Sequence, residues 1–175
     1  MQNSKKMIAG YPVGGLLVLV IVPSIIYFIT SLVDTICRIE IVPDATLRWI
    51  IIPLLLAVGL VYAIWSLIIQ NIVGKGGPME IGNIEISPKT KYLVVSGPYQ
   101  NTRNPMLFGA SLMYLAFALY INSLTSLVLV VALIVFMLTV VVKMEEKRLL
   151  KDFGSQYEEY RKKVPLFFPW FPRKK

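Results

Sequence analysis

The residues best suited to chemistry lie in a polar segment, 96–107, which reads SGPYQNTRNPML and stands between apolar runs. Gly97-Pro98 is typical of a turn. Asn104 followed by Pro105 predicts the start of a helix, because Asn caps free N–H groups and Pro already has the φ angle of the first helical position. The start of a helix presents unpaired N–H groups and the positive end of the helix dipole, so it favours an anion. Arg103 lies next to this predicted anion site.

The rest of the composition limits the chemistry further. Cys37 is the only cysteine, and the chain has no histidine. We therefore expect no intrachain disulfide, no metal site built from Cys and His, and no Cys–His or Ser–His nucleophile pair. Carboxylates, Arg, Lys, Tyr, amides, backbone groups or a bound cofactor must carry any reaction.

Much of this chain is predicted to lie in a lipid bilayer. Of 175 residues, 56% are hydrophobic and 16% are charged, and the mean hydropathy is +0.67. A soluble domain of this size has no core large enough to bury so much apolar sequence. The net charge of +8 comes from residues that flank the apolar runs. This pattern indicates membrane topology and attraction to anionic headgroups, and we expect no nucleic-acid partner.

Four apolar runs predict an all-α integral membrane protein, and a fifth, re-entrant or split segment is left open. Pro23 within the first run predicts a kink. The fourth run has no helix breaker before Gly154, so its helix could reach about 30 residues, or about 45 Å. That length exceeds a hydrocarbon core of about 30 Å, so its last turns should project from the membrane. The runs cover residues 11–33, 47–69, 106–121 and 124–142.

Two polar regions accompany the runs. The loop 70–103 is long for a helix connection and contains two β-prone pieces, 81–86 and 92–95, so we expect it to be ordered and functional. After Gly154, Ser155 and Glu158 predict a capping box for a short helix that ends at Lys163. The tail after this helix is aromatic and basic, as suits the membrane interface. We divide the chain into N-terminal transmembrane helices (1–70) and a C-terminal catalytic region (71–175).

The basic residues predict the orientation. Only Arg38 and Arg48 of the 18 Lys and Arg residues fall outside the N-terminus, the 70–103 loop and the C-terminal region. The positive-inside rule places those three regions, both termini and the predicted site on the cytoplasmic side.

The predicted hairpin of the third and fourth runs brings Arg103-Asn104-Pro105 close to Glu145-Glu146. A purely structural interpretation is available for each residue. Asn104-Pro105 is then a helix cap, Arg103 contacts headgroups, and the glutamates form a solvated helix end. On residue types alone, this interpretation is the more common one.

The order of two motifs favours a functional interpretation. GPYQNTRNP, an apolar hairpin and then EEKRLLKDFGSQYEEYRKKVPLFFP together resemble the isoprenylcysteine carboxyl methyltransferase family. They are also similar to the related phospholipid N-methyltransferases. The resemblance covers about residues 90–170. The family pattern is met by Gly97, Tyr99, Arg103, Pro105, Glu145, Glu146, Leu149, Phe153, Gly154, Tyr157, Tyr160, Val164 and Pro165.

The resemblance implies a membrane enzyme that binds S-adenosyl-L-methionine, and its product S-adenosyl-L-homocysteine, through the C-terminal half without a Rossmann domain. It implies catalytic roles for Arg103 and Glu145, with Glu146 in place of Glu145 if the register differs by one. Two departures stand out, since Asn104 replaces the family's His and Val141 stands where a substrate-side Arg is expected. The implied cofactor contacts are Lys91, Tyr92, Leu93, Val94, Tyr99, Asn104, Pro105, Met106, Leu107 and Glu145.

The residue types agree with this implied chemistry. A helix start beside Arg103 suits the carboxylate of S-adenosylmethionine, and Glu145 suits its amine or sulfonium. Tyr99 or Tyr92 could stack on adenine or face the cation. A carboxylate acceptor, with a reference pKa of about 3.5, needs no general base, whereas an ammonium acceptor must first lose a proton.

We therefore predict O-methylation of the α-carboxylate of a prenylated cysteine or a similar lipophilic acid within the bilayer. Three alternatives remain: phospholipid N-methyltransfer, a more distant helical membrane reductase using NADPH, and a non-enzymatic membrane adaptor or transporter component.

Overall fold

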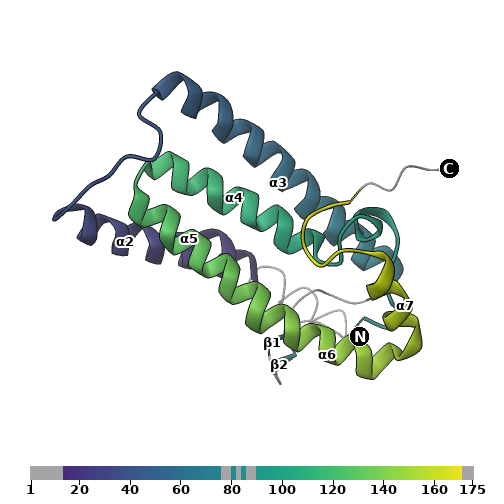
Figure 1. The fold of residues 1–175 in the computed structure, drawn as a ribbon. Helices are drawn as coiled ribbons and strands as arrows, with labels where there is room; N and C mark the ends of the chain where they lie inside the picture. The colour runs from purple at the N-terminus through teal and green to yellow at the C-terminus, as the bar shows by residue number, and fades with distance from the viewer. Residues whose placement is uncertain (1–13, 76–79, 82–83, 86–89, 171–175) are drawn as a thin grey trace.

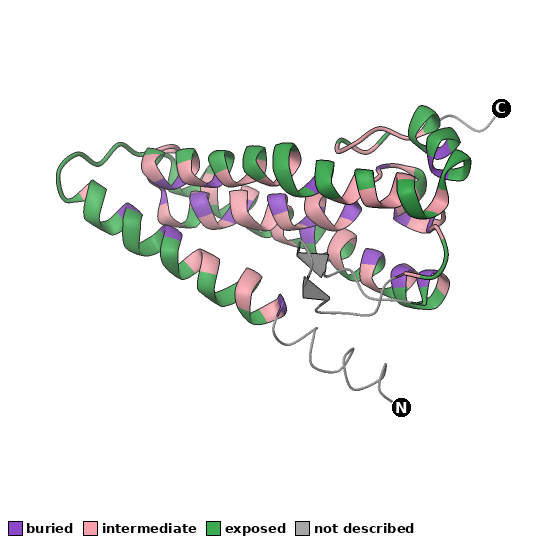
Figure 2. Ribbon diagram, turned by 90° about the horizontal axis from the view of Figure 1, so that it is seen from below, coloured by how far each residue is buried: buried purple, intermediate pink, exposed green. Residues whose placement is uncertain are grey.

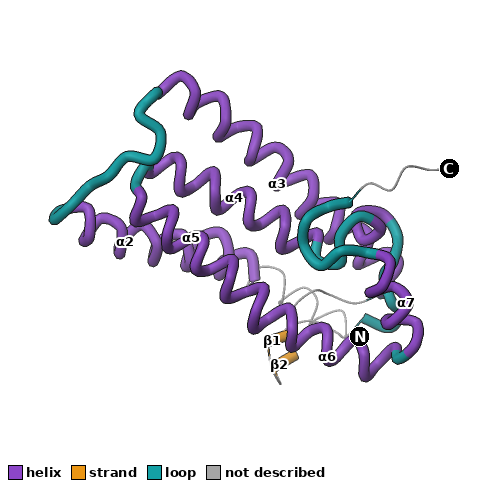
Figure 3. Tube along the Cα trace, viewed as in Figure 1, coloured by secondary structure: helices purple, strands orange, loops and turns teal. Residues whose placement is uncertain are grey.

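Long helices form almost the whole molecule (Figures 1 and 3). The computed structural model describes residues 14–75, 80–81, 84–85 and 90–170. In chain order the long segments are the π-helical turn η1 (Leu17–Ile21), α2 (Val22–Asp34), α3 (Ala45–Gly74), α4 (Pro105–Ile121), α5 (Leu124–Phe136), the π-helical turn η3 (Met137–Val141) and α6 (Val142–Phe153). A 3-10 turn η2 (Gly97–Gln100) precedes α4, and α7 (Ser155–Lys163) follows α6.

Three helical segments are long and apolar enough to cross a membrane: Gly14–Asp34, Ala45–Gly74 and Leu124–Phe153. The fourth apolar helix, Pro105–Ile121, is shorter at 17 residues. These helices confirm the predicted all-α membrane fold. The second predicted run was too short, because the helix continues through Gln70 and Asn71 to Gly74. The orientation and the number of crossings stay predictions.

Helix α3 packs on α4 along most of its length, α4 packs on α5, and α5 also packs on α2 (Figure 1). Gly59 and Gly109 face each other where α3 and α4 pack closely. A Cβ at Gly109 would lie 2.6 Å from the Gly59 carbonyl oxygen and 2.8 Å from the Ala63 nitrogen. The two backbones therefore touch where neither side has a side chain, as is usual for helices packed in lipid.

The buried residues face between the helices, and the outward faces are exposed (Figure 2). Ile26, Ala118 and Val130 form a small core where α2, α4 and α5 meet. Many large apolar side chains, such as Phe28, Leu54 and Val128, are more than half exposed. An apolar exterior on a helix bundle of this length matches a surface that contacts lipid.

The predicted kink at Pro23 coincides with a change of helix type. Pro23 lies in the first turn of α2, directly after the π-helical turn η1. Proline has no N–H to donate to the preceding turn, and a π-helical turn accommodates such a break in the hydrogen-bond ladder. The Tyr114 hydroxyl of α4 donates to the Val18 carbonyl within this turn, at 2.6 Å.

The two β-prone pieces of the loop were only partly correct. The strands β1 (Glu80–Ile81) and β2 (Ile84–Glu85) pair antiparallel, so the first piece is a small hairpin rather than one strand. Its residues 82–83 and 86 lie outside the described residues. Residues 92–95 form no strand. The Lys91 N–H instead donates to the Gly74 carbonyl at the end of α3 (2.8 Å), which ties this piece to a helix end.

The end of the long helix is as predicted, but its neighbour begins differently. The final helix is continuous from Leu124 to Phe153 and ends at Gly154, which has a positive φ of 50°. Gly154 itself is the N-cap of α7, and no side chain caps this helix. The predicted capping box is therefore wrong, because Ser155 is already the first helical residue and cannot also serve as the cap. The predicted end at Lys163 is confirmed.

Candidate functional site

The segment that precedes α4 is held by the C-terminal tail. The Arg103 N–H donates to the Pro165 carbonyl (2.9 Å), and the Thr102 hydroxyl donates to the Phe167 carbonyl (2.9 Å). The Trp170 N–H donates to the Asn101 carbonyl at 2.8 Å. These long-range bonds wrap the tail around the start of α4 and fix the backbone of both segments. The composition of the tail predicts a place at the membrane interface but not these contacts.

Asn104 occupies the predicted N-cap position, but its side chain does not cap the helix. Pro105 is the first helical residue, as predicted, and no side chain accepts from the first turn. The Asn104 amide instead donates to the Leu166 carbonyl at 3.0 Å. The predicted cap bond is thus wrong, because the tail competes for the same side chain. By contrast, Asp44 at the start of α3 accepts from both Thr46 and Leu47.

Arg103 and Glu146 form an ion pair between the start of α4 and α6. Their side chains are only 11% and 19% exposed. The Tyr157 hydroxyl of α7 donates to Glu146 Oε1 at 2.9 Å, and Arg103 Nη1 lies 3.4 Å from the same hydroxyl. Three elements therefore meet at one charged cluster, and the hairpin brings Arg103 and the glutamate pair together as predicted.

The glutamate in contact with Arg103 is Glu146, the alternative in the sequence interpretation, and not Glu145. Consecutive helical residues point about 100° apart, so only one of the two can face Arg103. Glu145 lies 3.7 Å from Arg148 on the same helix, with 39% of its side chain exposed. Glu145 is therefore the more accessible carboxylate of the two. The catalytic roles of Arg103, Glu145 and Glu146 stay predictions.

A second set of hydrogen bonds joins α7, η2 and α3. The Tyr160 hydroxyl donates to the Tyr99 carbonyl at 2.6 Å, and the Tyr99 hydroxyl donates to Gln70 Oε1 at 3.1 Å. Sequence reasoning singled out Tyr99 but missed Gln70. The available signal was a polar amide directly after an apolar run.

Burial changes the acidity of these groups. It raises the pKa of Tyr157 to about 12, and it also raises the pKa values of Tyr160 and Tyr99 above the ordinary tyrosine value. Burial lowers the pKa of Arg103. The three tyrosines are therefore neutral hydrogen-bond donors near pH 7 and poor general bases.

The other predicted contact residues lie on two elements. Val94 is buried against the end of α3, where a Cβ at Gly74 would lie 3.0 Å from its Cγ2. Leu93 is half-buried, while Lys91 and Tyr92 are exposed, and Lys75 Nζ lies 5.6 Å from the Tyr92 ring centroid. In the first turn of α4, one residue is buried and two are half-buried: Pro105, Met106 and Leu107. Both elements adjoin η2 and its Tyr99.

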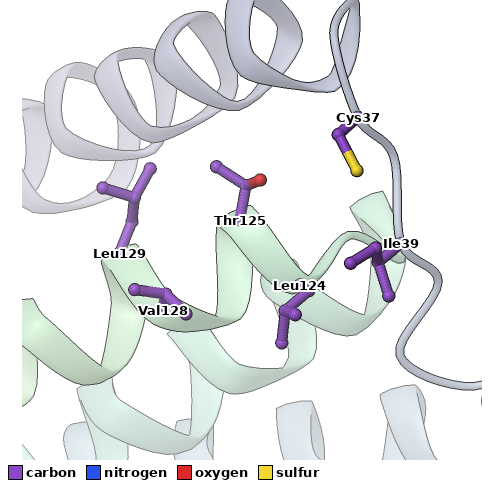
Figure 4. A pocket seen from close by; sticks show the side chains of 6 residues that line it. All are labelled: Cys37, Ile39, Leu124, Thr125, Val128 and Leu129. Carbon is purple, nitrogen blue, oxygen red and sulfur yellow. The ribbon is translucent and has the colours of Figure 1, made fainter.

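Two cavities lie at opposite ends of the helices. One, of about 500 Å³, lies beside the cluster and is lined by Arg103, the end of α7 and the tail. The other, of about 270 Å³, lies between the loop after α2 and the start of α5 (Figure 4). Cys37 and Ile39 line it from the loop, and its remaining lining residues come from α5: Leu124, Thr125, Val128 and Leu129.

The family model for phospholipid methyltransferases matches residues 47–156. The chain belongs to the phospholipid methyltransferase family. The match runs from α3 into α7 and includes Arg103, Glu145 and Glu146. Family membership supports a membrane methyltransferase and confirms the resemblance found in the two sequence motifs. Searches of the curated proteins and of the solved structures found no match.

Methyltransferases of this family generally use S-adenosylmethionine, and the cluster offers groups that fit it. Arg103 Nε is buried and has no hydrogen-bond partner among the described residues. The first turn of α4 is not capped by a side chain. Both features suit a carboxylate, and the exposed part of Glu145 suits an amine or a sulfonium.

Proposed function

We propose that this protein is an S-adenosylmethionine-dependent methyltransferase that O-methylates the carboxylate of a lipophilic acid, such as the α-carboxylate of a prenylated cysteine. The observation that carries this proposal is the Arg103–Glu146–Tyr157 cluster at the start of α4, within the part matched to the methyltransferase family or directly beside it. When bound, S-adenosylmethionine supplies a methyl group activated by a sulfonium.

The protein's own residues would bind and orient. Arg103 Nε and the N–H groups of the first turn of α4 would hold the cofactor carboxylate. Glu146 and Tyr157 would keep the Arg103 side chain in place, because both contact its Nη1. Glu145 would face the cationic end. Correct positioning can contribute about 7–11 kcal/mol to such a displacement, so residues that only hold the reactants matter greatly.

The tail would exclude water. Its hydrogen bonds to Asn101, Thr102, Arg103 and Asn104 close one side of the cluster. A dry site strengthens the contacts of charged groups and prevents hydrolysis.

The residue types favour a carboxylate acceptor, which needs no base. A carboxylate is already ionised near neutral pH. The chain has no histidine, and burial keeps Tyr99, Tyr157 and Tyr160 protonated. A phosphatidylethanolamine amine would first need to lose a proton.

Phospholipid N-methyltransfer is the second candidate, favoured by the description of the matching family. In that case Glu145, with 39% of its side chain exposed, is the residue available to accept the proton. The Glu145→Gln variant separates the two reactions. It should abolish N-methylation, whereas O-methylation should lose activity only in proportion to weaker cofactor binding.

Calorimetry with S-adenosylhomocysteine and the full chain in detergent tests the cofactor site. Arg103→Ala and Glu145→Ala should each weaken binding at least about tenfold, as expected for loss of a charged contact. Lys151→Ala, which removes an exposed charge on α6, is the matched control and should have no effect. No binding by the folded wild type would leave the adaptor or transporter alternative, and unchanged affinity in both variants would refute the site.

Transfer of a radiolabelled methyl group identifies the acceptor. We expect labelling of N-acetyl-farnesylcysteine, with a base-labile product that marks an ester. Stable labelling of phosphatidylethanolamine instead would establish the second candidate.

A further inference from the structure

A basic groove of about 500 Å³ lies between the end of α7 and the C-terminal tail. One wall carries three consecutive positive residues, Arg161, Lys162 and Lys163, in the last turn of α7. Arg103 also lines the groove, and Phe168 and Trp170 of the tail contribute an aromatic wall.

The charge of this groove is not balanced by the protein. Glu146 compensates Arg103. In the part of the chain that the structure describes, Arg161, Lys162 and Lys163 make no ion pair with a carboxylate, including Glu158 and Glu159 of the same helix. Burial lowers the pKa of Arg103, and the positive charge of Arg161 acts in the same direction. The three uncompensated cations at the end of α7 repel each other unless an anion enters the groove.

The backbone of the aromatic wall is hydrogen-bonded to the protein, and its side chains are left uncovered. Backbone hydrogen bonds from Arg103 to Pro165 and from Trp170 to Asn101 fix the tail on the protein. The Phe168 and Trp170 side chains are nevertheless 73% and 67% exposed. Exposed aromatic side chains beside Lys and Arg are typical of the membrane interface, where one part of a ligand is apolar and another is charged.

We propose that this groove binds the headgroup of an anionic phospholipid, with its phosphate at the basic end of α7 and its glycerol and acyl carbons against Phe168 and Trp170. The basic wall needs an anion, and the aromatic wall needs an apolar neighbour, so one lipid satisfies both. This site goes beyond the proposed methyl transfer, since its ligand is neither the cofactor nor the methyl acceptor.

Native mass spectrometry of the full chain in detergent tests the proposal by counting bound lipid. The wild type should retain dihexanoyl-phosphatidylglycerol and bind dihexanoyl-phosphatidylcholine much more weakly. Each basic residue near a lipid surface changes affinity about fivefold, so the Lys162→Gln/Lys163→Gln double variant should lose at least about tenfold. Lys147→Gln/Lys151→Gln removes two exposed lysines from α6 and is the matched control, for which we expect less than a twofold change.

Three further measurements keep the proposal open to refutation. Raising the salt concentration should weaken phosphatidylglycerol binding by the unaltered protein, which requires no variant to fold. Trp170→Ala should weaken binding of the lipid but not of glycerol phosphate, and the lipid should bind much more tightly than glycerol phosphate. Equal binding of the two lipids, equal loss in both double variants, salt-independent binding, or equal affinity for glycerol phosphate and lipid would each overturn it.

Discussion

The two ends of the α4–α5 hairpin both gather polar side chains, but they use them differently. At the turn between the helices, the Ser123 hydroxyl donates to Asp34 (2.7 Å), and the Asn122 side chain accepts from the Val42 N–H (3.0 Å). These groups bind one another and tie the turn to the loop after α2. At the other end, Arg103 and Glu146 form a charged pair, while Arg103 Nε has no hydrogen-bond partner among the described residues.

The difference shows how a structural polar cluster can be told from a binding site. A polar group whose hydrogen bonds are complete stabilises the fold and has nothing left for a ligand. A buried donor without a partner costs about 1–3 kcal/mol, and a bound anion would satisfy it. The cavities agree with this division, because the one near the turn is lined mainly by apolar residues and the other is basic.

The largest effect is expected from breaking the charged end. Arg103→Ala should lower methyl transfer at least about 100-fold, because it removes a positioned charged donor. Asp34→Ala at the other end should lower thermal stability but leave the activity of the folded protein within about twofold, since a hydrogen bond to a carboxylate contributes about 1.5–3 kcal/mol to folding and this one lies far from the cluster. Radiolabelled transfer and thermal unfolding measure the two. Equal loss of activity in both variants would remove the distinction between the ends.

A smaller effect is expected midway between the ends, where α3 and α4 touch. Gly109→Val should destabilise the protein by about 2 kcal/mol, because even the Cβ would lie 2.6 Å from the Gly59 carbonyl oxygen. Gly15→Val is the control, since a Cβ there has nothing within 4 Å. Unfolding in mixed detergent micelles checks this prediction. A Gly109 variant as stable as the control would show that the backbones do not need this close approach.

Asn122 tests the turn between α4 and α5 without affecting the charged end. It is 2% exposed and has a φ of 56°. Asn122→Ala should cost about 1–2 kcal/mol, from strain in the left-handed region and from the lost bond to Val42. Asn122→Gly avoids the strain and isolates the lost bond, so it should cost less. The same unfolding measurement separates the two, and methyl transfer by the folded variants should not change.

The smallest effect is expected from Tyr157→Phe at the charged end. It removes one of the hydrogen bonds to Glu146 but leaves the ion pair, so methyl transfer should fall only about fivefold.

Tyr157 also predicts a pH dependence. Its pKa is raised from 10.0 to about 12 in the folded protein, so the unfolded chain releases this proton first. Stability from this group is complete below pH 10 and is lost as the pH rises toward 12. Thermal unfolding of Tyr157→Phe should show a shallower loss over that interval. Identical pH profiles would mean that this tyrosine is not buried as described.

The positions of the long helices could be predicted from the sequence, because long apolar runs must contact lipid or protein. Their length is enough to indicate helices that can span a membrane. The end of the fourth helix at Gly154 followed from a single residue that tolerates a positive φ. Asn104 shows where local reasoning fails. The residue type was correct for a cap, but the Leu166 carbonyl, 62 positions away, takes its side chain.

The candidate site shows the same division. The two ordered motifs were enough to indicate the family and to place Arg103 near a pair of glutamates. Which glutamate contacts Arg103 depends on how α6 is rotated about its axis relative to α4. Glu145 and Glu146 are adjacent in sequence, so only this rotation distinguishes them. The contact of Gln70 with Tyr99 and the basic groove could not be predicted, because both form only when α3, α7 and the tail pack together.

The sequence by itself determined the class of this protein: a helical membrane protein of a methyltransferase family, with most of its basic residues in the N-terminus, one loop and the C-terminal region. Periodicity, hydropathy and motif order are properties of neighbouring residues, so they can be read along the chain. Only the tertiary structure decided that Glu146 rather than Glu145 pairs with Arg103, that the tail replaces the helix cap, and that three cations and two aromatic residues share a groove. Those are contacts between residues far apart in sequence, and packing alone brings them together.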